Sequence, residues 1–385
     1  MIRAILTGLL FLTSTLWASA DVTAFGADPT GVKTSTAAIQ AAIEAGGSVH
    51  FPAGHYSCGP IVIDKSVVFT GDGSGNTVIT FTQSGGDCVN ICSSVGAVSV
   101  QQISFVAGAN ESSGALIDVT GSSQVAISDV LLNGPYHIGI QLNNFPGGPT
   151  DIARVHIIGG TASSIGVLAA NPGPLTSLRD VCVQGLGTGS PGYGIVIAQA
   201  DDMLLDHVTG SGCAIGLFMT GGAECEFNDC IFDLCQQDAF LNGTGSSFVQ
   251  SITFKGCWFG DSGQNGLVIE GNTAQVDLIG CHTGEYTGLG NQGSGIIIYC
   301  PATGVHINAC TISGNQDFGV YVGPNVYDFT ITNSRIGSAR NPNGYGIAIG
   351  SGDAAYIITN NSFLGNNGGA ILGTISPGTI VNNNM

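Results

Sequence analysis

Positive charge is scarce in this sequence: 8 Lys and Arg stand against 26 Asp and Glu in 385 residues, so the formal net charge is −18. Proteins that bind nucleic acids neutralise phosphates with a basic surface, which argues against that class here. Direct pairing with an acidic substrate is poorly supported for the same reason. The 61 Gly follow no strict every-third-residue pattern, which excludes a collagen triple helix. A hydrophobic content of 43% excludes intrinsic disorder.

A long membrane-spanning segment and a paired C-x-x-C zinc pattern are also missing. The only extended apolar stretch is Ala4–Trp17, which follows Arg3 and precedes the small residues Ala18–Ala20. This order is typical of a secretory signal peptide, predicted to span residues 1–20 and to be removed after Ala20; a membrane anchor is the alternative. Export, to the extracellular space, the periplasm or the cell surface, would place the twelve cysteines where disulfides can form.

The strongest signal is an internal repeat. Short apolar runs that mostly open with Gly recur about every 25 residues, as they do in solenoid proteins. Two further apolar columns run in phase with them, and no helical segments alternate with these strands. This pattern predicts an all-β parallel β-helix of about 11–12 coils, each with about three short strands. The runs open at Gly114, Gly139, Gly166, Gly194, Gly216, Ala239, Gly266, Gly295, Gly319, Gly346 and Gly369.

Two columns of this repeat suggest specific contacts between coils. Cys230, Cys257, Cys281 and Cys310 fall at one repeat position, which fits either disulfides between neighbouring coils or a stack of buried thiols. The middle residues of the Gly-opened strands are predicted to point outward, and ten of the eleven are apolar. Such a face suits packing against identical chains, so we expect a homo-oligomer, most simply a trimer. The eleven positions are Leu116, Gln141, Leu168, Val196, Phe218, Leu241, Val268, Ile297, Tyr321, Ala348 and Ile371.

The N-terminal part is different, because Ser35–Glu44 has the i, i+4 apolar spacing of a helix, with Ser35 as its predicted N-cap. A solenoid needs such a cap over its first coil. We therefore divide the chain into a signal peptide (1–20), an N-terminal cap with the first strands (21–60) and the β-helix (61–385).

The segments Val22–Ala27, Thr36–Ile43 and Gly47–Tyr56 together resemble the opening of the pectate-lyase-like β-helix superfamily. That group includes polygalacturonases, rhamnogalacturonases, exo-β-1,3-glucanases, uronan epimerases and phage tailspike depolymerases. The resemblance implies a secreted, right-handed β-helix that acts on polysaccharide. The polygalacturonase motifs N-T-D, D-D and G-H-G are not kept: Gln236–Asp238 matches the first only at Asp238, and Gln264–Asn265 and Gly293–Gly295 replace the others.

Acidic residues cluster where the chain turns back toward the Gly-opened strands. Neighbouring coils would bring these carboxylates about 5 Å apart and alternate coils about 10 Å apart, which brackets the spacings of glycosidase carboxylate pairs. We take Asp238, Asp261, Glu285 and Asp317 as candidate catalytic residues, with Asp233 on the same ridge. A carboxylate ridge could also bind Ca²⁺, or it could simply keep the surface solvated. No other cofactor is indicated.

Three further sets of residues complete the candidates. Trp258 and His282 fall on neighbouring coils facing outward, where an aromatic ring can stack on a sugar. A second acidic column, Asp129, Arg154, Asp180, Asp206 and Asp229, predicts an ion-pair ladder around Arg154 and a second place where Ca²⁺ could bind. His207 is placed in the inward column, as a core histidine.

These observations predict an exported polysaccharide hydrolase or lyase that uses carboxylates on the turn ridge. The alternative is a non-catalytic glycan-binding or adhesin-like surface protein. Hydrolysis ranks above lyase chemistry, because side chains able to remove a C5 proton are sparse along the coils.

Overall fold

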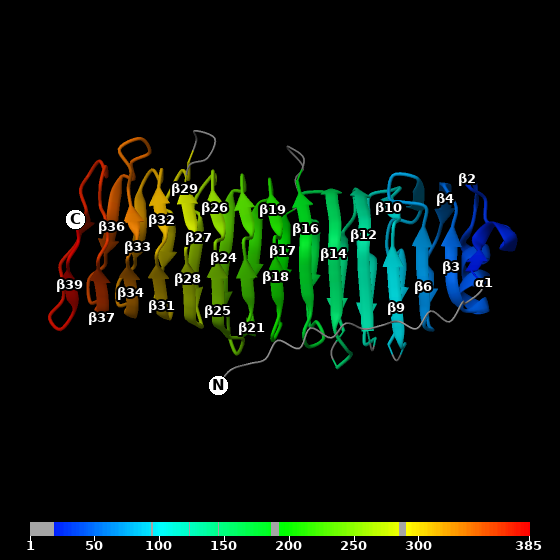
Figure 1. Ribbon diagram of the computed structural model, residues 1–385, viewed down its shortest axis with the longest axis horizontal. Helices are drawn as coiled ribbons and strands as arrows, with labels where there is room; N and C mark the ends of the chain where they lie inside the picture. The colour runs from blue at the N-terminus through cyan, green and yellow to red at the C-terminus, as the bar shows by residue number, and fades with distance from the viewer. Residues whose placement is uncertain (1–18, 94, 123, 145, 186–191, 285–289) are drawn as a thin grey trace.

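The chain folds into a straight rod of stacked coils (Figure 1). This computed structural model describes residues 19–385 except 94, 123, 145, 186–191 and 285–289. The predicted signal peptide therefore lies almost wholly outside the described residues. Cleavage after Ala20 would remove two of the three residues of β1 (Ser19–Asp21), which pairs with β3 (Gly47–Phe51).

One face of the rod is a parallel sheet of thirteen strands, hydrogen-bonded in chain order, so each strand belongs to one coil. The fold is thus an all-β right-handed parallel β-helix of about thirteen coils, and the predicted number of 11–12 is slightly low. Its first strands, β5 and β8, precede Gly114, where the sequence repeat begins. The strands are β5 (Ile61–Ile63), β8 (Val89–Ile91), β11 (Ala115–Thr120), β13 (Ile138–Asn143), β15 (Ile165–Ala169), β17 (Tyr193–Ile197), β20 (Ile215–Met219), β24 (Gln237–Gly243), β27 (Leu267–Gly271), β30 (Ile296–Ile298), β33 (Phe318–Val322), β36 (Tyr345–Ile349) and β38 (Ile371–Leu372).

The other faces form a second parallel sheet of 26 strands, which bends once in each coil. Besides β1 and β3 it contains β2 (Thr30–Thr34), β4 (Gly54–Cys58), β6 (Val67–Gly71), β7 (Thr77–Phe81), β9 (Ala97–Gln101), β10 (Ser104–Ala107), β12 (Gln124–Gly134), β14 (Thr150–Gly159), β16 (Ser177–Gln184), β18 (Leu204–Asp206), β19 (Thr209–Ser211), β21 (Gly222–Ala223), β22 (Glu226–Asn228), β23 (Ile231–Asp233), β25 (Val249–Lys255), β26 (Trp258–Gly260), β28 (Thr273–Ile279), β29 (His282–Gly284), β31 (Thr303–Asn308), β32 (Thr311–Ser313), β34 (Tyr327–Thr332), β35 (Arg335–Ile336), β37 (Ala354–Thr359) and β39 (Ile380–Asn382).

A residue with positive φ forms the bend in most coils. Asp129, Arg154, Asp180, His207 and Asp229 occupy this corner in five successive coils. The predicted acidic column is therefore a column of left-handed corner residues, which Asp and Asn adopt more readily than most side chains do. Two predictions are wrong at this corner, because the register of one coil is shifted by one residue. His207, not Asp206, is the corner residue, and it is exposed rather than in the core.

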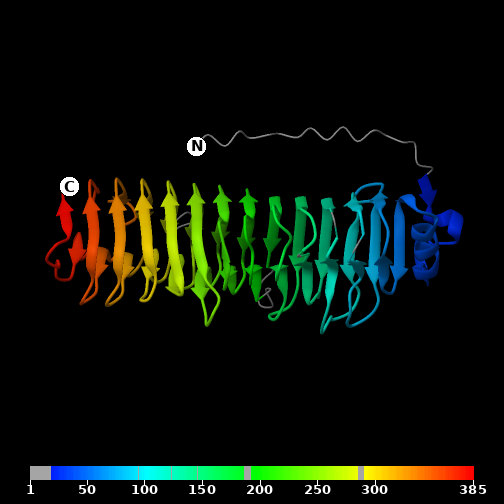
Figure 2. The ribbon, with the colours of Figure 1, turned by 90° about the horizontal axis from the view of Figure 1, so that it is seen from below.

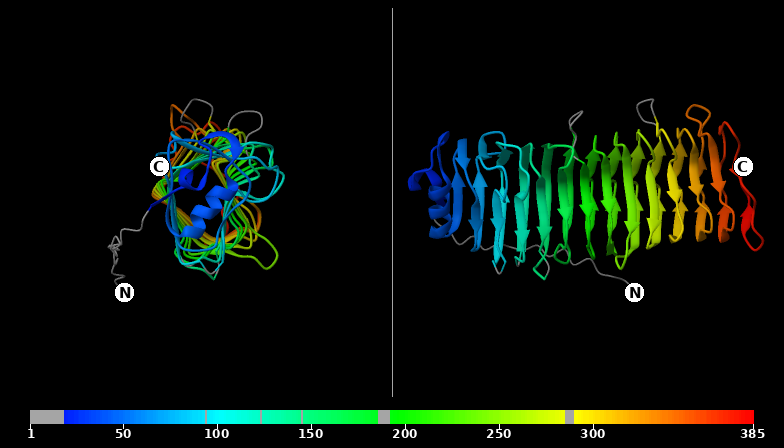
Figure 3. Two further views of the ribbon diagram at one scale, coloured as in Figure 1. Left: turned by 90° about the vertical axis from the view of Figure 1, so that its right-hand side faces the viewer. Right: turned by 180° about the vertical axis from the view of Figure 1, so that it is seen from behind.

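The helix α1 (Thr36–Ala45) lies at the N-terminal end of the rod, after the short 3₁₀ helix η1 (Val22–Phe25) (Figures 1 and 3). Its apolar side, including Ile39 and Ile43, is fully buried. Ser35 is the N-cap residue, but its side chain makes no capping bond. Instead its hydroxyl oxygen accepts a hydrogen bond from the Asp28 backbone N–H at 3.0 Å.

The coils stack along the rod (Figure 2). This stacking places equivalent side chains of neighbouring coils next to each other in the interior, as ladders. All twelve cysteines are free, and the predicted stack Cys230, Cys257, Cys281 and Cys310 consists of buried thiols. Each thiol donates to a backbone carbonyl of the preceding coil, as Cys257 Sγ does to Phe227 O at 3.4 Å. A second ladder is made by buried asparagines: Asn291 donates to Asn315 Oδ1 (2.9 Å) and Asn315 to Asn343 Oδ1 (2.8 Å).

The outward column of the thirteen-stranded sheet differs from the predicted one at three positions. Asp118, Phe240 and Leu372 point outward where Leu116, Leu241 and Ile371 were expected. Nine of the eleven residues in the corrected column are apolar, and Phe218 and Phe240 stack on each other with ring centres 5.5 Å apart. Among the described residues no helix is long and apolar enough to cross a membrane.

Candidate functional site

Three of the ridge carboxylates come together on two neighbouring coils. Asp233 ends β23, Asp238 is the second residue of β24, and Asp261 follows β26. Asp233 pairs in register with Gly260, directly before Asp261. Burial of this region raises the pKa of both Asp233 and Asp238, and the negative charge of Asp261 raises each further.

Asp238 is enclosed in the rod. It occupies the repeat position that Gly216 and Gly266 hold in the adjoining coils, because the register places Ala239 opposite Leu217 and Leu267. An added Cβ at Gly266 would lie 2.6 Å from the Gly295 carbonyl oxygen, so this position is tight. Asp238 has no exposed surface, and neither carboxylate oxygen has a hydrogen-bond partner among the described residues. This placement does not suit the direct catalytic role predicted for Asp238.

Asp233 and Asp261 are less enclosed than Asp238, although Asp261 keeps only 7% of its surface exposed. Asp233 is half-buried, and its Oδ1 is a buried oxygen with no hydrogen-bond partner in the described part of the chain. Burial raises the pKa of Asp233, while a hydrogen bond with Ser211 lowers it. Asp261 lies between β26 and β27 and has a left-handed backbone with φ of 57°. Its Oδ1 accepts a hydrogen bond from the Gly290 N–H at 3.0 Å. The pair therefore combines a carboxyl whose pKa is raised by burial with a second acidic side chain on the next coil.

An aromatic pair lies on the same face. Trp258 opens β26 opposite His282 of β29, and the two rings stack with centres 5.5 Å and planes 17° apart. A Cβ added to Gly260 would lie 2.4 Å from Trp258 Nε1, so the indole covers this glycine beside Asp233. The predicted proximity of Trp258 and His282 is thus present, with Trp258 half-buried and His282 exposed.

The remaining predicted carboxylates do not join this group. Glu285 lies outside the described residues. Asp317 is exposed on the turn before β33, two coils beyond Asp261, which is roughly 10 Å along the rod. Its backbone bonds to the neighbouring turns through Gly293 O and Tyr345 N.

A second acidic group lies near the N-terminal end of the thirteen-stranded sheet. Asp118 points outward from β11 and accepts hydrogen bonds from Gln141 Nε2 (2.9 Å) and Asn90 Nδ2 (3.1 Å). Glu111, on the turn before β11, has a buried Oε1 without a partner among the described residues, and burial raises its pKa to about 7. Neither residue was predicted from the sequence. The repeat is recognisable only from Gly114 on, and counting from Gly114 makes Leu116 instead of Asp118 the outward residue of β11.

The surface ion pairs follow the predicted ladder only in part. Arg154 forms a bidentate ion pair with Asp129, with hydrogen bonds of 2.7 and 2.8 Å. The charge of Asp180 raises the pKa of Arg154 without a hydrogen bond between the two side chains. Within the described ranges, no three His, Cys, Asp or Glu side chains come close enough to hold a metal ion. We therefore derive no step through Ca²⁺.

The geometry defines a β-helix rod with two acidic side chains, the half-buried Asp233 and the largely buried Asp261, close to the stacked Trp258 and His282. Two family models match the chain: the right-handed β-helix region at residues 216–385, and the rhamnogalacturonase A/epimerase, pectate-lyase-like model at residues 19–93. These two matches, over separate parts of the chain, support a place in the pectate-lyase-like superfamily of right-handed β-helix proteins.

Solved structures share the fold at low sequence identity. The A-module of mannuronan C-5 epimerase AlgE4 from Azotobacter vinelandii is 17% identical, with a TM-score of 0.59 over 94% of this chain and 99% of that one. The catalytic unit of an α-1,3-glucanase from Streptomyces thermodiastaticus is 16% identical, with a TM-score of 0.59 over 95% and 70%. The surface adhesin PfbA of Streptococcus pneumoniae is 11% identical, with a TM-score of 0.51 over 89% and 91%. No curated protein matches by sequence.

Proposed function

We propose that this protein is an exported polysaccharide-degrading enzyme, and that it hydrolyses glycosidic bonds with Asp233 and Asp261. The observation that carries the proposal is the carboxylate pair on neighbouring coils beside the stacked Trp258 and His282. The β-helix epimerase and glucanase of similar fold support a polysaccharide as the substrate class.

In this mechanism Asp233 is the proton donor. Because burial raises its pKa, Asp233 retains a proton that it can deliver to the glycosidic oxygen as the bond breaks. Asp261 is the second carboxylate, which activates water or attacks the sugar directly. The stacked pair of the half-buried Trp258 and the exposed His282 supports a sugar ring next to these groups by stacking.

The test is a panel of neutral and acidic polysaccharides, with and without chelator, assayed for new reducing ends and for the ultraviolet absorbance of unsaturated products. We expect reducing ends without unsaturation. Asp233→Asn and Asp261→Asn should each lower the rate at least about 100-fold, because each removes one proton-transfer group. Asp317→Asn, an exposed carboxylate on the same ridge, is the matched control and should keep full activity.

Other results would redirect the proposal. Unsaturated products that disappear with chelator would indicate a Ca²⁺-dependent lyase. Retention on one glycan without any turnover, lost in Trp258→Ala, would indicate a glycan-binding protein. Full activity in both Asp233→Asn and Asp261→Asn would refute the assigned roles.

A further inference from the structure

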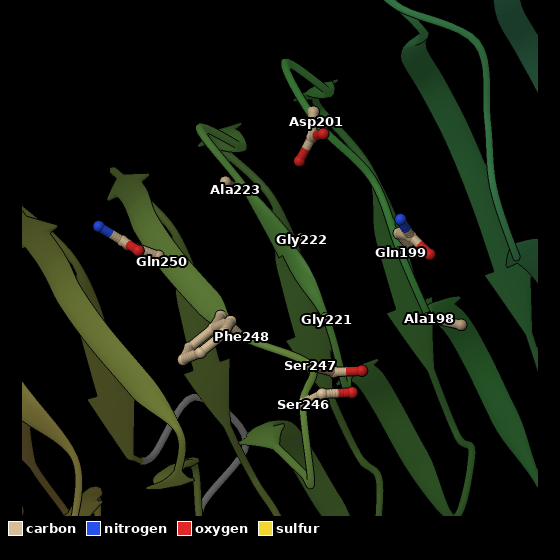
Figure 4. Close-up of a pocket in the computed structure, with 10 residues that line it drawn as sticks. All are labelled: Ala198, Gln199, Asp201, Gly221, Gly222, Ala223, Ser246, Ser247, Phe248 and Gln250. Carbon is tan, nitrogen blue, oxygen red and sulfur yellow. The ribbon is translucent and has the colours of Figure 1, made fainter. Parts of the chain in front are cut away.

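A groove lies along the turns that come directly after strands of the thirteen-stranded sheet in the chain. Asp261, in contrast, lies on a turn that comes before a strand of this sheet. The groove consists of two adjoining hollows of about 460 and 240 Å³, which share Gln199 and Asp201. The larger hollow is shown in Figure 4. Its lining comes from three neighbouring coils, at Ala198–Asp201, Gly221–Ala223 and Ser246–Gln250.

The groove exists because one turn is much shorter than those around it. Only Thr220 and Gly221 separate β20 from β21, whereas longer turns follow the neighbouring strands β17 and β24, and also β15, one coil beyond β17. Gly222 has φ of +128°, and an added Cβ would lie 2.4 Å from the Ala200 carbonyl oxygen. Glycine thus lets this turn lie flat, and the flanking turns with Pro172 and Phe248 rise beside it as walls.

The lining is polar but carries no positive charge. Gln199, Gln250, Ser246 and Ser247 supply amide and hydroxyl groups, and Figure 4 shows the two serine hydroxyls pointing to the same side. Asp201 and Asp202 are the charged residues of the lining, which contains no Lys, Arg or His. Such a groove repels anions and offers hydrogen bonds to a neutral ligand rich in hydroxyl groups.

An exposed aromatic ring completes the groove. Phe248 keeps 62% of its surface exposed, although a phenyl ring of this size is ordinarily buried. One face of a sugar ring is apolar and stacks on an aromatic side chain, while its hydroxyls reach the polar groups around it. Phe248, the amides and the carboxylates provide both kinds of contact in one groove.

The walls and floor are held by backbone hydrogen bonds. Gly222 N donates to Phe248 O at 2.7 Å, and Ala223 N donates to Ala200 O at 2.8 Å. Asp202 N donates to Ala223 O at 3.1 Å, and Ser247 N to Thr244 O at 2.9 Å. A ligand therefore meets a surface that is already ordered, which lowers the entropy cost of binding.

We infer that this groove is a binding site for a neutral oligosaccharide, separate from the Asp233–Asp261 site. It would hold an uncharged stretch of a polysaccharide against the rod. The inference does not depend on catalysis, because a glycan-binding protein would use such a groove equally well.

The test is calorimetric titration with neutral hexasaccharides (β-1,4-, β-1,3- and α-1,4-linked glucose and β-1,4-linked xylose) and with a hexauronate as the charged comparison. The protein should carry Asp233→Asn, so that hydrolysis does not consume the ligand. We expect at least one neutral hexasaccharide to bind, and Phe248→Ala or Gln199→Ala to weaken its Kd at least tenfold.

Two controls separate this groove from other sites. Leu175→Ala removes a neighbouring side chain that is 69% exposed but lies outside the lining, and it should leave the Kd unchanged. Trp258→Ala is the second comparison: a Kd weakened by this variant but not by Phe248→Ala would place the ligand at the proposed catalytic site and overturn the inference. The inference is overturned if none of the neutral hexasaccharides binds, if the hexauronate binds more tightly, or if Phe248→Ala and Gln199→Ala bind as the parent does.

Discussion

Replacing Asp238 by Asn tests the effect of a fully buried carboxyl group on stability. Asp238 has no exposed surface, and neither of its oxygens has a hydrogen-bond partner among the described residues. Burial raises the pKa of Asp238 well above its usual range; the backbone of Cys235 opposes this shift, and the charges of Asp233 and Asp261 add to it. The group is therefore neutral in the folded protein over a pH range in which it ionises in the unfolded chain. We expect Asp238→Asn to remove this pH-dependent penalty while keeping the shape of the side chain.

The sign and the size follow from linkage. Below a pH of about 3.9 both states are protonated, and the folded protein has its full stability relative to this group. As the pH rises toward the raised folded pKa, the unfolded state alone loses the proton, and the unfolding free energy falls by about 1.4 kcal/mol per pH unit. Over the range in which the folded-state carboxyl keeps its proton, the wild type should lose stability relative to Asp238→Asn with this slope. Each lost kcal/mol corresponds to roughly 1–2 °C in Tm for a chain of this length.

The assay is thermal unfolding followed by circular dichroism from pH 4 to pH 8, with Asp317→Asn as the exposed control. Asn at position 238 is itself buried without partners, so the change of the Tm difference with pH is the signature, not its value at one pH. A difference that stays constant across this range would refute the reasoning, because Asp238 would then titrate as a solvated carboxyl does.

Three further predictions concern other parts of the rod. Asn315→Ala should lower the free energy of unfolding by roughly 2–4 kcal/mol, because the Asn291 side-chain amide and the Asn343 side-chain oxygen each lose a buried hydrogen-bond partner. The measurement is denaturant unfolding, and an unchanged midpoint of the unfolding curve would contradict the asparagine ladder. Glu111, with its pKa raised to about 7, contributes stability below its ordinary pKa that is lost as the pH rises through 7. Glu111→Gln should therefore gain Tm relative to the wild type between pH 5 and pH 8, and a parallel pH profile would count against this. The mature chain should sediment as an oligomer, most simply a trimer. Phe240→Ser should weaken this association, because it removes the stack of Phe240 on Phe218 in the outward column of the thirteen-stranded sheet. A wild-type monomer at micromolar concentration would disprove the oligomer.

The repeat period and the apolar columns predicted the β-helix because each coil must present the same apolar positions to the coils on both sides. The errors in register came from four coils with unusual residues at the repeat positions. In the last of these coils Ala370 takes the position of Gly346, so Leu372 and not Ile371 points outward. Asp238 takes the glycine position of its coil, so the sequence analysis aligned Ala239 instead and placed Leu241 outward. Leu116 takes the same position near the N-terminal end, and this hid Asp118. Leu205 lies where Leu204 was expected, which moved His207 into the core.

The candidate site was predictable only in outline. The sequence placed Asp233, Asp238 and Asp261 on one ridge, and it placed Trp258 beside His282, because a constant repeat fixes which residues neighbour each other along the rod. The burial of each carboxyl was not predictable, because it depends on whether the backbone of the adjoining coils encloses the side chain.

The sequence by itself therefore determined the architecture of this protein, its acidic surface and the columns that stack along it, since all three follow from composition and period. The tertiary structure alone decided which side chains reach solvent. A shift of one residue in a parallel strand moves a side chain from the surface into the interior, as the exposed His207 shows. Asp238 is fully enclosed, while Asp233 is half-buried and Asp261 keeps 7% of its surface exposed. The groove around Phe248 was likewise decided by tertiary structure, because it arises from the unequal lengths of turns that meet only when the coils stack.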